Sequence, residues 1–227
     1  AKTMAEAREY ELSLQALEKV FASGQKGAVQ MEAQLEQARN LLALKRLDES
    51  HKKIEAFLKE YGKTTFALPA NQLLIDVIAA EIENEMDDAK RNAFMGKATD
   101  VFRFLKQLKN TPEDMAGYDL QGGYLLKGKM QAEIKLGRKE EAEKTRGKAI
   151  TAFQTLMMRL QPSTPALGET LEAAYHEAIP LMMELKIWPE IVSDGEKYLS
   201  MFPTGRYATD IRNWVNQAKI EVNSSKK

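Results

Sequence analysis

The chain has 227 residues, of which 44% are hydrophobic and 29% charged, so it can bury a core and does not have a disordered composition. Its 33 basic and 33 acidic residues cancel, which argues against general attraction to nucleic acid or to an anionic membrane. Cysteine is absent, which excludes disulfides, thiolate nucleophiles and zinc sites that need cysteine. We therefore expect a folded protein without a nucleic-acid partner.

No apolar run approaches the roughly 18 residues that a membrane-spanning helix needs, so we expect no transmembrane segment. The first residues, AKTMAEAREYEL, are charged and do not resemble a signal peptide. The chain begins at Ala1 instead of methionine, as does an exported protein whose leader has been removed, or a shortened chain. We favour export, and the residues alone leave the compartment open.

Apolar residues recur at the spacing of amphipathic helices along almost the whole chain, and the alternation typical of strands is missing. Short segments rich in glycine, proline and small polar residues separate them, and such short connections make neighbouring helices antiparallel. We also expect a short disordered tail at about 223–227. Ten helices are predicted, at residues 3–22, 28–45, 47–61, 69–86, 88–109, 113–136, 138–160, 165–186, 188–202 and 206–222.

Prolines mark two helix starts and one irregularity. Thr111 before Pro112, and Thr164 before Pro165, are each typical of an N-cap residue followed by proline at the first helical position. Pro180 lies inside the eighth predicted helix, where it lacks a backbone donor and crowds the preceding turn. We expect a kink or a break there.

Two segments of the chain align without a gap: LKRLDESHKKIEAFLKEYGKTTFALPANQLL from Leu44, and LKIWPEIVSDGEKYLSMFPTGRYATDIRNWV from Leu185. Each copy is predicted to be a second helix that ends in an aromatic residue, a tight turn, and a new first helix opened by an aromatic–Ala pair. Stacking of such units would bury one continuous core. The aromatic residues in register are Phe57, Tyr61 and Phe66 in one copy, and Tyr198, Phe202 and Tyr207 in the other.

A third copy, AEIKLGRKEEAEKTRGKAI, lies in the middle of the chain, where Gly137 would turn it between two helices. The segment resembles the tetratricopeptide repeat, whose small-residue positions are matched here by Ala132, Gly137, Ala142 and Ala149. Arg146 stands where that family has a large aromatic residue, and the spacing between turns is about 40–50 residues against the usual 34. The helices are therefore expected to be longer than those of a standard repeat.

The stretch WPEIVSDGEKYLSMFPTGRYATDI, from Trp188 to Ile211, resembles repeats of bacterial envelope assembly proteins, the BamD-like outer-membrane lipoproteins and the YbgF-like periplasmic proteins. The resemblance implies an all-α fold, a right-handed α-solenoid of about five antiparallel helix pairs that forms one domain over residues 1–227. It also implies a periplasmic or cell-envelope location, with the cytoplasm as the alternative.

Two motifs come close to known catalytic or ligand-binding patterns. Residues 123–130, GYLLKGKM, approach a phosphate-binding loop, but the preceding strand and the hydroxyl residue for magnesium are missing. His176 and Glu177 begin like a zinc-protease motif, but Pro180 stands in place of the second histidine. Carboxylate pairs lie on predicted polar faces, where neither member is buried enough for acid–base catalysis. We expect no catalytic, cofactor-binding or metal-binding residues, no cofactor and no enzymatic activity.

Two further clusters have competing interpretations. The acidic stretch at residues 81–88 is interpreted as a solvated surface, with a contact to a partner's basic patch as the alternative. The Leu-Met-Met triplets at 156–158 and 181–183 are interpreted as core packing, with a copper site or an adaptable binding surface as the alternatives.

A helical solenoid presents an extended surface lined by the first helix of each pair, which suits an extended peptide or a helix of another protein. We expect a non-catalytic scaffold or adaptor in the assembly of a bacterial envelope complex. The alternatives are a sensor of a peptide or small ligand, a structural spacer, and an enzyme domain with an unrecognised site. The expected partner contacts are exposed polar and aromatic residues of first helices: Asn40, Asn71, Tyr124, Lys127, Gln131, Tyr175 and Arg212.

Overall fold

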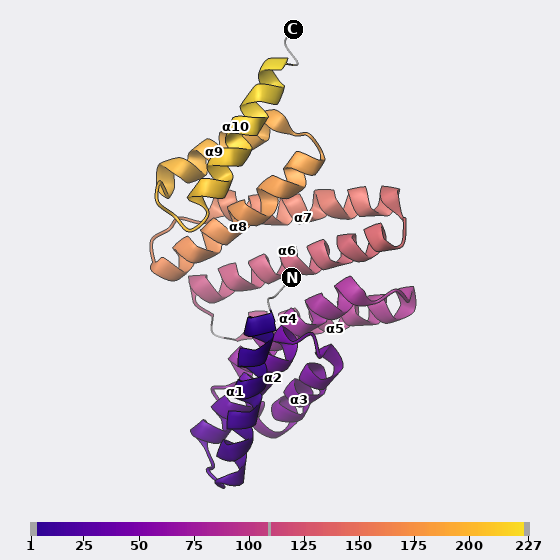
Figure 1. Ribbon diagram of the computed structural model, residues 1–227, viewed down its shortest axis with the longest axis vertical. Helices are drawn as coiled ribbons and strands as arrows, with labels where there is room; N and C mark the ends of the chain where they lie inside the picture. The colour runs from indigo at the N-terminus through magenta and orange to yellow at the C-terminus, as the bar shows by residue number, and fades with distance from the viewer. Residues whose placement is uncertain (1–3, 109, 225–227) are drawn as a thin grey trace. The chain divides into compact units, whose positions relative to one another are not determined.

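The computed structural model describes residues 4–108 and 110–224, and all regular structure in them is helical (Figure 1). The helices are α1 (Met4–Ala22), α2 (Ala28–Ala43), α3 (Leu47–Tyr61), α4 (Ala67–Asn84), α5 (Asp88–Gln107), α6 (Pro112–Lys135), α7 (Lys139–Arg159), α8 (Pro165–Glu184), α9 (Trp188–Met201) and α10 (Ala208–Ser224). The all-α prediction is confirmed, and no predicted bound within these residues is more than two residues from the observed one. The predicted bounds at residues 3 and 109 lie outside the described residues. None of the described helices is long and apolar enough to cross a membrane.

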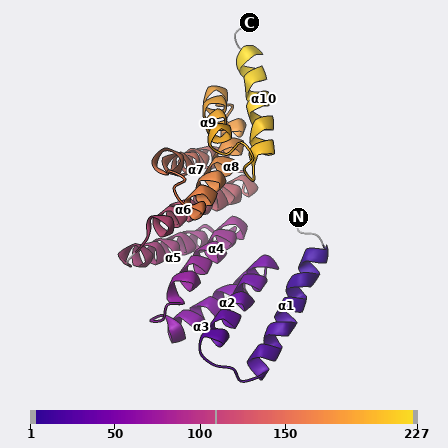
Figure 2. The same cartoon turned by 90° about the vertical axis from the view of Figure 1, so that its left-hand side faces the viewer.

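The helices form two compact units, α1 to α5 and α6 to α10, and each consecutive pair within a unit packs together. This packing agrees with the expected solenoid-like arrangement. In the first unit α2 also contacts α4, and in the second unit α8 contacts both α6 and α10 (Figure 2). The first helices of successive pairs therefore adjoin one another and form a layer in each unit. The single domain stays a prediction.

One turn joins the two helices of three different pairs. Lys45, Gly137 and Lys186, which follow α2, α6 and α8, have φ angles of 62°, 74° and 58°. After each of them, the next amide donates to the carbonyl five residues earlier, as in a Schellman helix end. The left-handed conformation costs a non-glycine residue about 1 kcal/mol, yet two of the three turns use lysine. These hydrogen bonds run from Arg46 to Leu41, from Arg138 to Glu133 and from Ile187 to Met182.

The junction between one pair and the next is also repeated in the two aligned segments. The amide of the turn residue, Thr64 or Gly205, donates to the carbonyl three residues earlier. The carbonyl of the same turn residue accepts from the amide of the alanine that opens the next helix. These alanines, Ala67 and Ala208, are 7% and 5% exposed, so each lies at the seam between two pairs. The aligned aromatic–Ala pairs therefore occupy equivalent positions in the fold.

Side-chain caps start the helices where the sequence predicts them. The Thr111 hydroxyl accepts from the Asp114 amide at 3.1 Å, and the Asp114 carboxylate accepts from the Thr111 amide at 2.9 Å. This reciprocal capping box satisfies two amides that the helix itself leaves unpaired. The Thr164 hydroxyl likewise accepts from the Leu167 amide at 3.3 Å. Both predicted starts are confirmed.

Two local expectations are wrong in part, and the kink expected at Pro180 stays a prediction. No break occurs at Pro180, because α8 continues to Glu184 through a segment whose side chains at Ile179 and Met182 are fully buried. That packing holds the helix together although proline removes one backbone hydrogen bond. The disordered tail expected at about 223–227 also begins too early, since α10 includes residues 223 and 224. Residues 225–227 lie outside the described residues.

The core of the second unit is built around three fully buried aromatic side chains, Phe153, Tyr175 and Tyr198. The Leu-Met-Met triplets belong to this core, as expected, although Met158 is 73% exposed. Helices α6 and α7 pack closely at Gly123, where a Cβ atom would overlap the Phe153 ring. The adjoining Gly122 has open space at its Cβ position.

This difference predicts opposite effects for two neighbouring substitutions. Gly123→Ala should lower the free energy of unfolding of the second unit by about 1–3 kcal/mol, because the new methyl group overpacks the α6–α7 contact. Gly122→Ala should raise it by up to about 1 kcal/mol through helix propensity alone. Urea unfolding followed by tryptophan fluorescence measures both, since Trp188 and Trp214 lie in this unit. Equal effects of the two changes would contradict the close packing at Gly123.

Candidate functional site

Three of the seven predicted contact residues are buried, so the expectation that they are exposed is wrong. Asn40, Asn71 and Tyr175 are 2%, 7% and 0% exposed. The Asn40 amide group donates to the Ser13 hydroxyl at 2.8 Å and so ties α2 to α1. The Asn71 amide group donates to the Ala67 carbonyl at 2.8 Å. A polar residue on a first helix is expected to face solvent, but these amides pair with backbone and side-chain groups inside the fold.

The other four predicted residues lie in the second unit and retain some exposure. Tyr124 and Gln131 are half-buried on α6, and Arg212 is exposed on α10. Lys127 of α6 forms an ion pair with Glu177 of α8, so it links two first helices. The binding role of these residues stays a prediction.

A hollow of about 440 Å³ lies on the first-helix layer of the second unit. It is formed by side chains of α6 and α8 together with the turn that leads into α10, so all of its walls come from first helices and their junction. We call it the first-helix pocket. Its lining residues are Tyr124, Glu169, Glu172, Ala173, Arg206 and Tyr207.

A hydrogen-bonded chain fixes one wall of the first-helix pocket. The Tyr198 hydroxyl donates to Glu172 Oε2 at 2.5 Å and accepts from the Tyr207 amide at 3.2 Å. Burial, together with this hydrogen bond to Glu172, raises the pKa of Tyr198, so the hydroxyl stays protonated. Gly205 leaves the room that this contact needs, because a Cβ atom there would lie 2.7 Å from the Tyr198 hydroxyl. The junction between α9 and α10 is therefore locked to α8.

Aromatic and charged side chains surround Tyr207. Its ring stacks on His176, with 4.0 Å between ring centroids and 22° between planes. The Trp214 ring centroid lies 5.4 Å from that of His176, and the guanidinium carbon of Arg206 lies 5.4 Å from the Tyr207 ring centroid. Both members of the zinc-protease-like motif are thus engaged, since His176 stacks on Tyr207 and Glu177 pairs with Lys127.

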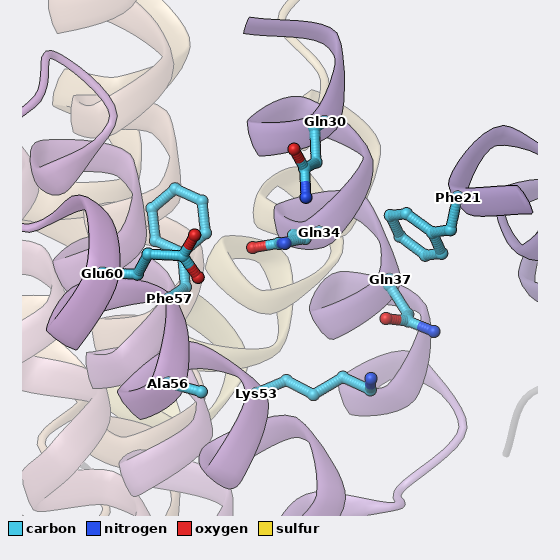
Figure 3. A pocket seen from close by; sticks show the side chains of 8 residues that line it. All are labelled: Phe21, Gln30, Gln34, Gln37, Lys53, Ala56, Phe57 and Glu60. Atoms are coloured by element: carbon cyan, nitrogen blue, oxygen red, sulfur yellow. The ribbon is translucent and has the colours of Figure 1, made fainter. Parts of the chain in front are cut away.

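A second hollow, of about 350 Å³, lies in the first unit between α1 and α3 (Figure 3). Three glutamine amides line it along α2, with Phe57 and Glu60 on one side and Phe21 on the other. The nearby Glu60 carboxylate raises the pKa of the Tyr61 hydroxyl. The lining residues are Phe21, Gln30, Gln34, Gln37, Lys53, Ala56, Phe57 and Glu60.

A charged cluster in the first unit was not predicted from the sequence. His51 Nδ1 lies 2.8 Å from both carboxylate oxygens of Glu81, and His51 Nε2 lies 3.0 Å from Lys97 Nζ. Lys97 Nζ also donates to Glu55 Oε1 at 2.6 Å. These four residues connect α3, α4 and α5. Glu81 and Lys97 are 30 and 46 residues from His51 along the chain, so no spacing pattern could have joined them.

Hydrogen bonding to Glu81 raises the pKa of His51 despite the opposing effects of burial and of Lys97. The interpretation of the acidic stretch as a solvated surface is therefore wrong for Glu81, whose side chain is 11% exposed. Two other members of the stretch have local roles: Asp87 caps α5 by accepting from the Lys90 amide at 2.8 Å, and Asp88 pairs with Arg91.

The two motifs that resemble a phosphate-binding loop and a zinc-protease site do not form such sites. Residues 123–130 lie inside α6, so they form a helix and not a phosphate-binding loop. In the described part of the chain, no group of three or more His, Asp or Glu residues is arranged to hold a metal ion. His51 lines neither of the two hollows. The absence of cofactor and catalysis stays a prediction.

No protein-family model matches this chain, and a search of curated proteins finds no match. The resemblance to tetratricopeptide repeats and to envelope assembly proteins therefore stays a prediction, and the function has to be argued from the geometry.

The raised pKa of His51 predicts a pH-dependent stability. Unfolded histidine has a pKa of about 6.5, so protonation favours the folded state while its folded pKa is higher. This contribution is fully present below about pH 6.5 and is lost as the pH rises through the folded pKa. His51→Gln should cost about 2 kcal/mol at pH 6 and less at pH 9, measured by urea unfolding followed by circular dichroism. An equal cost at both pH values would show that the histidine charge contributes nothing.

Two tyrosine-to-phenylalanine changes separate a paired hydroxyl from an unpaired one. Tyr198→Phe removes a hydrogen bond to a carboxylate and should lower the free energy of unfolding by about 2 kcal/mol. Tyr175 is equally buried, but its hydroxyl has no hydrogen-bond partner among the described residues. Tyr175→Phe should therefore cost less than about 0.5 kcal/mol or be stabilising. Thermal unfolding of the two variants checks this, and a larger loss for Tyr175→Phe would contradict the assigned hydrogen bonds.

Proposed function

We propose that this protein is a non-catalytic scaffold that binds a segment of another protein on the first-helix layer of its second unit. The observation that supports this most directly is the first-helix pocket, a hollow of about 440 Å³ whose walls come from α6, α8 and the turn before α10. Three elements far apart in the sequence converge there, as expected for a surface that binds an extended ligand.

The side chains around the pocket suit binding better than chemistry. Tyr124 and Tyr207 are large amphipathic side chains of the kind that is enriched at protein interfaces. Glu172 and His176 are engaged by Tyr198 and Tyr207, so neither is positioned as a free acid or base. Preformed walls of this kind reduce the ordering cost of binding.

The proposed biological setting follows from the resemblance alone. Repeats similar to the segment from Trp188 to Ile211 occur in envelope assembly proteins of bacteria, so we propose that the bound partner is a component of an envelope complex. This part of the proposal is independent of the pocket, and a partner from another compartment would leave the scaffold function intact.

A photo-crosslinking amino acid at two positions tests the binding surface. p-Benzoylphenylalanine placed at Tyr124 should form a covalent adduct with a partner protein in cells of the source organism. The same group at Lys148, an exposed position on α7, should not. The partner is then identified by mass spectrometry, purified, and titrated against the full chain.

Titration of the purified partner tests whether it binds the first-helix layer. Tyr124→Ala should weaken binding of the purified partner at least tenfold, as expected for an aromatic contact at the centre of an interface, while Lys148→Ala should leave binding unchanged. Equal crosslinking from both positions, or unchanged affinity of Tyr124→Ala, would refute binding at the first-helix layer. Charge reversal at Lys127 is unsuitable here because it would break the ion pair with Glu177.

A further inference from the structure

We infer that the first-helix pocket binds a cationic side chain, arginine or lysine, of the partner protein. This inference rests on the proposed function and adds the chemistry of the bound segment. It is carried by two carboxylates in the pocket, by the comparison of this position with the other copy of the repeat, and by the charge of the lining.

Glu169 and Glu172 lie three residues apart on α8, so both carboxylates are on the same side of the helix, and both line the pocket. Glu169 is exposed at the rim, and Glu172 is half-buried below it. Glu172 uses Oε2 to accept from Tyr198. A carboxylate has about four acceptor positions, so Glu172 can take further donors from a ligand. An ammonium or guanidinium group supplies such donors.

The repeat does not require acidic residues at these two positions. Counting back along α2 and α8 from the shared turns at Lys45 and Lys186, the residues equivalent to Glu169 and Glu172 are Ala28 and Met31. The first unit nevertheless forms the same turn and the same junction hydrogen bonds. The two acidic residues are therefore a property of the second unit and not of the repeat.

The two carboxylates differ in whether they have a structural role. Glu172 accepts from Tyr198, whose equivalent in the first unit is Phe57, so a structural hydrogen bond accounts for this acid. Glu169 forms no ion pair within 4.0 Å and no side-chain hydrogen bond among the described residues. Its charge at the rim is left without a structural role, which makes it the residue that best tests ligand binding.

The lining has an excess of negative charge. Two carboxylates face one guanidinium, that of Arg206, which lies over the Tyr207 ring and has no ion-pair partner in the described part of the chain. An anionic ligand would have to approach both carboxylates, which is electrostatically unfavourable. A cationic side chain instead gains two acceptors, and its aliphatic stem can pack against the aromatic residues that line the pocket.

The test is an NMR titration of the full chain with three small probes at constant ionic strength. The probes are N-acetyl-arginine amide, N-acetyl-lysine amide and N-acetyl-citrulline amide, the last being a neutral analogue of the first with nearly the same shape. The two cationic probes should cause saturable shifts at the backbone amides of residues 124, 169–173 and 205–207, with millimolar affinity. The citrulline probe should cause no saturable shift.

Three variants assign the effect to the pocket. Glu169→Gln should weaken binding of the arginine probe about threefold, the range expected for an exposed ion pair. Glu143→Gln makes the same charge change at an exposed position on α7 and should have no effect. Arg206→Gln removes the competing cation and should strengthen binding.

Equal shifts with the arginine and citrulline probes, or no shift with either, would overturn the inference. Loss of binding of the arginine probe in Arg206→Gln would also overturn it. These outcomes are independent of the crosslinking test: a partner captured at Tyr124 with no response to the cationic probes would refute the cation site and leave the scaffold function standing.

Discussion

The left-handed turn that follows α2, α6 and α8 is the constraint on which the rest of the structure depends. It reverses the chain within a few residues and satisfies the last carbonyls of one helix before the next begins. Because it recurs with the same hydrogen bonds, three of the pairs share the same connection, and the first helices of neighbouring pairs come into contact within each unit. The first-helix pocket exists because of this contact.

The two aligned segments show how one backbone supports two different surfaces. Both contain the same turn and the same junction, and both bury an alanine at the seam. In the second unit, Tyr198 adds a hydroxyl where the first unit has Phe57, and this hydroxyl locks Glu172 and the Tyr207 amide in place. The polar groups of the first-helix pocket are therefore added to a backbone framework that both units share.

The two units place their buried charge differently. In the first unit, His51 lies among Glu81, Glu55 and Lys97, within the packing of α3, α4 and α5 and away from the hollow between α1 and α3. In the second unit, three charged residues, Glu169, Glu172 and Arg206, line the first-helix pocket. The charged cluster around His51 therefore connects helices within the first unit, while we propose that the carboxylates of the first-helix pocket bind a ligand.

Local rules in the sequence determined the ten helices, their caps and the repeat, because helical periodicity, N-cap residues and turn residues act over a few positions. Only the tertiary structure decided which polar residues face solvent: Asn40 and Asn71 lie on first helices but are buried, and α8 continues through Pro180 because its neighbours pack around it. It also brought His51 to Glu81, and Glu172 to Tyr198. Burial and pairing depend on which helices meet, and that is set by packing between residues far apart in the chain.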